Sequence, residues 1–122
     1  MYRVLIVDDD LTVRIRLKNL ISWELLECEI VGEAAHGLEA IALLDTVQPD
    51  IVITDIYMPG MNGVDLIHYI REQASEIYVL ALSAYDDFDY VRNSLRYGAF
   101  DYLLKHQLTA SRLEQILEEA TT

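Results

Sequence analysis

The chain has 122 residues, of which 52% are hydrophobic, and its formal net charge is −12. This length fits one domain with its own core, and the composition excludes an intrinsically disordered chain. The acid excess excludes nucleic-acid binding by this domain alone, because the domain would repel phosphate backbones. No apolar run reaches the roughly 18 residues of a membrane span. Acids follow the apolar amino-terminal residues too soon for a signal peptide, so we expect a cytoplasmic protein that does not contact a membrane.

Cys28 is the single cysteine, so an internal disulfide cannot form. It begins a strand-like run, where a lone cysteine usually acts as a small buried hydrophobic residue. We therefore expect a structural role for Cys28.

Short apolar runs alternate with helical patterns along the whole chain. The expected strands are residues 3–7, 28–34, 50–54, 77–83 and 99–104. The expected helices, one after each strand, are residues 11–22, 38–47, 64–73, 87–98 and 110–120. Such an order predicts an α/β fold, in which helices cover both faces of a five-stranded parallel sheet. Ligands of these sheets bind beyond the carboxyl ends of the strands.

Charged or reactive side chains follow four of the five expected strands. They are Asp8, Asp9 and Asp10 after the first strand, Asp55 after the third, Ser83 after the fourth and Lys105 after the fifth. The second strand offers only His36, which is a weak candidate.

Together these groups fit phosphoryl chemistry. Carboxylate oxygens without a Cys/His cluster suit Mg²⁺, and a cation-compensated aspartate can attack phosphorus. Lys105 and the Ser83 hydroxyl can then hold the phosphoryl oxygens. Each residue alone has a plainer explanation, such as a turn-forming aspartate, a helix-capping serine or a solvated lysine. Their occurrence at matching strand ends favours a common site.

Four ordered motifs, "VLIVDDD", "DIVITDIYMPGMNGVDLI", "LALSAYDDFDY" and "GAFDYLLK", cover essentially the whole chain. They resemble the response-regulator receiver domain of two-component signalling. The finer pattern, including Trp23 in "ISWELLECEIVGEA", is similar to YesN-like regulators, whose output domain is an AraC-type helix-turn-helix DNA binder. The resemblance implies a single receiver domain over residues 1–122 without that output domain. It also implies a flavodoxin-like (CheY-like) doubly wound sheet of strand order 2-1-3-4-5 with five helices.

The resemblance assigns the acids different roles. Asp55 becomes the phosphoacceptor, and Asp8 and Asp9 become the acid pair that holds Mg²⁺ together with Asp55. The backbone carbonyl of Tyr57 is the expected third protein ligand. Asp10 matches no ligand position, and we expect it at the start of the first helix, where negative charge is favourable.

The resemblance also implies a switch and its partners. Ser83 and Tyr102 occupy the two switch positions, and Lys105 is the cation of the site. A cognate sensor histidine kinase supplies the phosphoryl group, and the switch acts on the output domain. The face formed by residues 87–98, 99–104 and 110–120 is the candidate surface for a homodimer. The domain catalyses only its own phosphorylation and dephosphorylation.

His106 departs from the family pattern, which has proline after the lysine with a cis peptide bond. A non-proline cis bond costs about 2.5–4 kcal/mol. Either that strain is held at the site, or the bond is trans and the loop differs. Both alternatives leave the placement of Lys105 open.

Two other functions compete with the receiver. "DDDLT" fits the nucleophile motif of haloacid-dehalogenase-type phosphatases, with Asp8 as the nucleophile. That enzyme needs acids at the end of a further strand after its lysine, and no further strand is expected after Lys105. The phosphatase would also leave Asp55 unexplained. A stand-alone or pseudo-receiver interaction module that is not phosphorylated is the second alternative. The presence of Asp8, Asp9, Asp55, Ser83 and Lys105 together argues against it.

Overall fold

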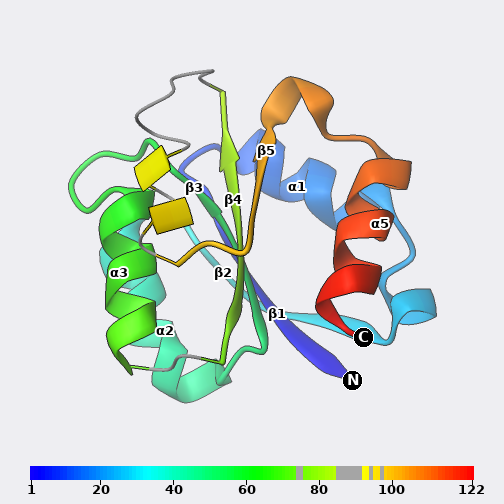
Figure 1. Cartoon of the computed structure of the whole chain (residues 1–122), viewed down its shortest axis with the longest axis horizontal. Coiled ribbons are helices and arrows are strands. Elements are labelled where there is room, and N and C mark those ends of the chain that lie inside the picture. The colour runs from blue at the N-terminus through cyan, green and yellow to red at the C-terminus, as the bar shows by residue number, and fades with distance from the viewer. Residues whose placement is uncertain (74–75, 85–91, 94, 97) are drawn as a thin grey trace.

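The chain folds into one parallel sheet with helices on both faces (Figure 1). A computed structural model describes residues 1–73, 76–84, 92–93, 95–96 and 98–122. The strands are β1 (Tyr2–Val7), β2 (Cys28–Ala34), β3 (Ile51–Asp55), β4 (Tyr78–Ser83) and β5 (Asp101–Leu104). All neighbouring strands pair in parallel, in the order β2-β1-β3-β4-β5, which confirms the predicted fold class.

The described part of the chain contains four α-helices rather than the predicted five. They are α1 (Leu11–Leu20), α2 (Gly37–Val47), α3 (Gly63–Gln73) and α5 (Ala110–Ala120). The expected helix at residues 87–98 lies mostly outside the described residues, although residues 92–93 and 95–96 are helical. All four α-helices are too short to cross a bilayer.

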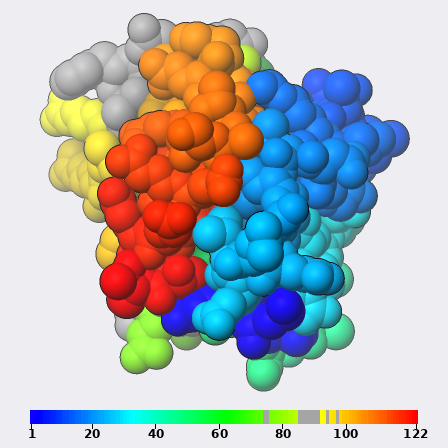
Figure 2. All heavy atoms as spheres, turned by 90° about the vertical axis from the view of Figure 1, so that its right-hand side faces the viewer, coloured from blue at the N-terminus to red at the C-terminus, as the bar shows by residue number. Residues whose placement is uncertain are grey.

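The apolar strands bury both of their faces, which explains their nearly continuous hydrophobic runs. On β1, Val4 and Ile6 belong to one core cluster, whereas Leu5 and Val7 belong to the other. Helices α1 and α5 cover the first cluster, and Figure 2 shows them side by side on that face. Helices α2 and α3 cover the second cluster on the opposite side of the sheet (Figure 1).

Polar side chains begin the helices, and Asp10 lies at the start of α1 as expected. The Asp10 side chain caps α1 by accepting from the Thr12 N–H at 2.9 Å. Thr109 caps α5 in the same way, and His36 Nδ1 caps α2. His36 is therefore a helix cap in this fold.

Two 3₁₀ turns were not predicted from the sequence. Helix α1 ends at Leu20, two residues before the predicted end at residue 22, and the turn η1 (Trp23–Leu26) follows. Trp23 is buried there, and its indole N–H donates to the Leu17 carbonyl at 3.2 Å. The turn η2 (Lys105–Gln107) follows β5 directly. Cys28 is fully buried, as expected for a structural cysteine.

Gly63, the first residue of α3, fixes this helix against the end of β3. A Cβ atom at Gly63 would lie 2.1 Å from the Asp55 carbonyl oxygen and 2.6 Å from the Ile56 Cα. The Gly63 N–H also donates to the Ile56 carbonyl at 2.7 Å. Only glycine permits this close approach of two backbone segments.

We predict that Gly63→Ala destabilises the fold by about 2–3 kcal/mol, because α3 must move away from β3. Gly60→Ala is the matched control. Gly60 has a φ of 76°, which strains the backbone of an L-residue, but a Cβ atom there meets nothing within 4 Å. Its expected cost is about 1 kcal/mol. Urea denaturation of both variants measures the difference. Equal losses of stability would contradict the close-packing argument.

Candidate functional site

The predicted site residues meet at one edge of the sheet. Asp8 and Asp9 directly follow β1, Asp55 is the last residue of β3, and Lys105 directly follows β5. The strands are parallel, so these positions lie at the same end of the sheet, which is the upper end in Figure 1. Both chain termini lie at the opposite end.

One ammonium group bridges two buried carboxylates. Lys105 Nζ lies 2.9 Å from Asp8 Oδ2 and 3.3 Å from Asp55 Oδ2. The side chains of Asp8 and Asp55 are only 1% and 5% exposed, whereas Asp9 is exposed. Asp8, Asp9 and Asp55 can each offer an oxygen to one point, since these oxygens all lie within 4.8 Å of one another.

The crowding of these charges shifts their protonation equilibria. Burial, together with the negative charge of Asp8, raises the pKa of Asp55 from 3.8 to about 6. Burial also raises the pKa of Asp8, although its hydrogen bonds to the Asp10 N–H and to Lys105 oppose this. Burial alone would lower the pKa of Lys105, but hydrogen bonds and attraction from Asp8 and Asp55 outweigh it, so that the pKa is raised. A single lysine thus only partly compensates the acids.

This donor set fits a divalent cation. Three carboxylates face one ammonium group, which leaves the cluster with an excess of negative charge when all are ionised. All the clustered donors are oxygens, which hard ions such as Mg²⁺ prefer. Asp10 is not in the cluster, because its side chain is engaged as the cap of α1.

The backbone around Asp8 is held by contacts that the sequence analysis did not anticipate. The Asp10 N–H donates to Asp8 Oδ1 at 2.9 Å, and Arg14 Nη1 donates to the Asp8 carbonyl oxygen at 2.5 Å. Arg14 is itself fixed by an ion pair with Glu33 of β2, at 3.1 Å. Lys18 pairs with the same glutamate at 2.6 Å, and these contacts lower the pKa of Glu33. Residues 14 and 18 share one helix face, but nothing in the sequence identifies Glu33 as their partner.

The two residues at the predicted switch positions lie on neighbouring strands. Ser83 is the fully buried last residue of β4 and pairs with Leu104 of β5. Tyr102 is half-buried on β5 and packs against the core cluster under α2 and α3. Tyr57 lies two residues beyond Asp55, and its side chain is 55% exposed. Its role as a carbonyl ligand remains a prediction.

The peptide bond between Lys105 and His106 is trans, since the described ranges contain no cis peptide bond. The chain turns instead through η2, with the Leu108 N–H donating to the Lys105 carbonyl at 3.2 Å. The lysine still reaches Asp8 and Asp55 from this loop. Of the two alternatives that the sequence leaves open, the trans bond is therefore correct.

Comparisons with known proteins agree with this architecture. The model of the response regulator receiver domain family matches residues 4–118. YesN, an uncharacterized transcriptional regulatory protein of Bacillus subtilis, is 36% identical over 122 residues, which cover 98% of this chain and 33% of YesN.

Two solved structures show the same fold over nearly the whole chain. The receiver (REC) domain of AraT, a response regulator from Geobacillus stearothermophilus, is 32% identical with a TM-score of 0.90, over 98% of this chain and 92% of that one. A CheX–CheY–BeF3–Mg²⁺ complex from Borrelia burgdorferi is 28% identical with a TM-score of 0.88, over 99% and 90% of the two chains.

The chain spans between a third and a half of the length of the curated relatives it matches. Within that span, the family match, the strand order and the acid cluster at the carboxyl ends of β1 and β3 all agree. The chain belongs to the response regulator receiver domain family of two-component systems.

Proposed function

We propose that Asp55 accepts a phosphoryl group from the phosphohistidine of a cognate sensor histidine kinase. The observation that carries this proposal is the bridge from Lys105 Nζ to the buried carboxylates of Asp8 and Asp55. Such a buried cluster of like charges destabilises the fold, and a catalytic use accounts for its presence. A solved relative, the CheX–CheY complex from Borrelia burgdorferi with beryllofluoride and Mg²⁺, supports the same chemistry.

In the proposed reaction a carboxylate oxygen of Asp55 attacks the phosphorus atom. A P–O bond forms, the P–N bond to the kinase histidine breaks, and the imidazole leaves with that electron pair. Lys105 pairs with the phosphoryl oxygens and offsets their negative charge, as a fixed cation does in other phosphoryl transfers. Mg²⁺, held by Asp8, Asp9, Asp55 and the Tyr57 carbonyl, would offset the remaining negative charge when bound.

Phosphorylation then acts as a switch. The new charge attracts the Ser83 hydroxyl, and Tyr102 moves toward the space that Ser83 leaves, which biases an equilibrium between two conformations. We propose that the switch acts in the cytoplasm on an AraC-type DNA-binding output domain in the full-length protein. The relatives that are transcriptional regulators support this output. A homodimer through helix 87–98, β5 and α5 remains a prediction, because most of that helix lies outside the described residues.

The phosphatase alternative has less support. Its second aspartate would be Asp10, whose side chain caps α1. This favours our proposal of a signalling phosphoacceptor over an enzyme that acts on a separate substrate.

We expect acetyl phosphate with Mg²⁺ to add one phosphoryl group to the chain, at Asp55. Intact-mass measurement followed by peptide mapping identifies the site. Asp55→Asn abolishes the modification, whereas the control Asp10→Asn keeps it, because asparagine also caps helices. Labelling at Asp8 would favour the phosphatase, and no labelling at all would favour the pseudo-receiver module.

Lys105→Met should slow the phosphorylation of Asp55 by at least tenfold, since the charge on the phosphoryl oxygens loses its fixed cation. Mg²⁺ affinity should be kept or increased, because a competing cation is removed from the acids. Phosphorylation kinetics and calorimetric titration with Mg²⁺ measure the two effects. Arg112→Met, on the exposed face of α5, is the matched cation control. A parallel loss of rate and of Mg²⁺ affinity would argue against the proposed role of Lys105.

Asp55→Asn should stabilise the metal-free fold at pH 7.5 by about 1–3 kcal/mol. The folded chain holds the Asp55 proton up to about pH 6, whereas the unfolded chain releases it near 3.8. Stability from this group is therefore present below about pH 4 and is lost as the pH rises through about 6. Urea denaturation with a chelator at pH 4 and 7.5 tests the sign. A variant less stable than the parent at pH 7.5 contradicts it.

A further inference from the structure

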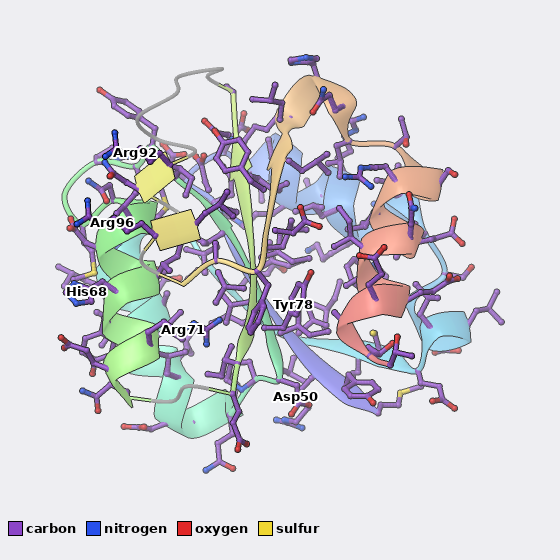
Figure 3. The ribbon with its side chains drawn as sticks, viewed as in Figure 1. Asp50, His68, Arg71, Tyr78, Arg92 and Arg96 are labelled. Atoms are coloured by element: carbon purple, nitrogen blue, oxygen red, sulfur yellow. The ribbon has the colours of Figure 1, made fainter. Side chains whose placement is uncertain are left out.

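The turn that leads into β5 is held from outside the sheet by an arginine of α3. Arg71 Nε donates to the Gly98 carbonyl oxygen at 2.8 Å. The guanidinium carbon of Arg71 also lies 4.8 Å from the centroid of the Phe100 ring, within cation–π distance. In Figure 3 Arg71 points from α3 toward the sheet, whereas His68 of the same helix points away from it.

Phe100 joins this contact to β4. Its ring stacks on Tyr78 with centroids 4.9 Å apart and planes 10° from parallel. The Phe100 N–H donates to the Val79 carbonyl at 2.9 Å, one residue before β5 begins. Two side chains and one backbone bond thus fix where the chain enters β5.

Gly98 makes the approach of Arg71 possible. Its φ is 116°, and a Cβ atom there would lie 2.3 Å from the Arg71 Cγ and 2.6 Å from its Nε. The arginine therefore lies directly over the glycine. The planar guanidinium donates and stacks at the same time, which a lysine cannot reproduce.

The strand that this contact holds is short and lies at the edge of the sheet. β5 has four residues and, among the described strands, pairs with β4 alone, while Leu103 packs in one core cluster and Tyr102 against the other. Yet it carries Tyr102 and runs directly into Lys105. The position of its first residue therefore matters for groups at its far end.

The opposite end of α3 touches the phosphoacceptor. Gly63 packs on the Asp55 carbonyl oxygen, and Arg71 lies about 12 Å further along the helix at 1.5 Å per residue. One rigid element thus contacts both the backbone of Asp55 and the entry to β5.

We propose that Arg71 is a positioning residue for the phosphoryl-transfer site. By fixing the Gly98–Phe100 turn on α3, it sets the position of β5 and so of Tyr102 and Lys105. The link to phosphoryl transfer depends on the proposed function, whereas the fixing of β5 does not.

Hydrogen exchange of the whole chain, followed by mass spectrometry, tests the fixing of β5. We expect Arg71→Ala to speed exchange at residues 99–104 at least fivefold and to leave β1 and β2 unchanged. Arg71→Lys keeps the charge and should show an intermediate effect. Arg112→Ala, which removes an exposed arginine of α5, should change neither region. Unchanged exchange at 99–104, or a uniform increase throughout the chain, would overturn the proposal.

Ligand titrations test the link to the site. Arg71→Ala should weaken the binding of beryllofluoride, a phosphoryl mimic, at least threefold in saturating Mg²⁺, because Lys105 is less well placed. Mg²⁺ affinity alone should not fall, since Asp8 and Asp9 follow β1 and Asp55 ends β3, neither of which Arg71 holds. Equal losses of both affinities, or of neither, would overturn the positioning role. If the unmodified chain itself does not bind beryllofluoride, the proposed function is wrong, and the exchange data still decide whether Arg71 holds β5.

Discussion

The ion pairs of Lys105 with Asp8 and Asp55 are the interaction on which the site depends. They bring together groups that follow three different strands and allow two nearly buried carboxylates to lie side by side. The compensation is incomplete, because burial and mutual repulsion still raise the pKa of Asp55 to about 6. The fold thus stores an electrostatic cost at the place where a cation and a phosphoryl group would relieve it.

The rest of the fold keeps these charges in position. Both faces of the sheet are buried, so the strands that carry the site are fixed by two separate cores. Close backbone packing at Gly63 sets the end of β3, Arg14 holds the Asp8 carbonyl, and Arg71 holds the entry to β5. Each contact lies outside the acid cluster, but each acts on a strand that delivers one of its members. Rigidity of this kind keeps reacting groups at a fixed separation.

Sequence patterns predicted a parallel sheet and the meeting of Asp8, Asp9, Asp55 and Lys105, because parallel strands bring their carboxyl ends to one edge. The strand order was expected only from the resemblance to receiver domains, and the structure confirms it. They did not predict η1, the Arg14–Glu33 pair or the Arg71 contact with Gly98. The turn η1 is too short to show a hydrophobic period. The two contacts join residues far apart in the chain, and hydrophobic periodicity carries no information about such pairs. The trans bond after Lys105 is a property of the folded loop, since the sequence allowed two loop geometries.

If Asp8, Asp9 and Asp55 hold Mg²⁺ as proposed, Asp55 must lose its proton when the ion binds. Calorimetric titration with Mg²⁺ in buffers of different ionisation enthalpy, between pH 5 and 8, measures both the affinity and the protons released. With a pKa of about 6 for Asp55, the account predicts that affinity rises with pH through this value. It also predicts the release of nearly one proton per ion at pH 5 and almost none at pH 8. An affinity that does not change with pH, with no proton release, would contradict it.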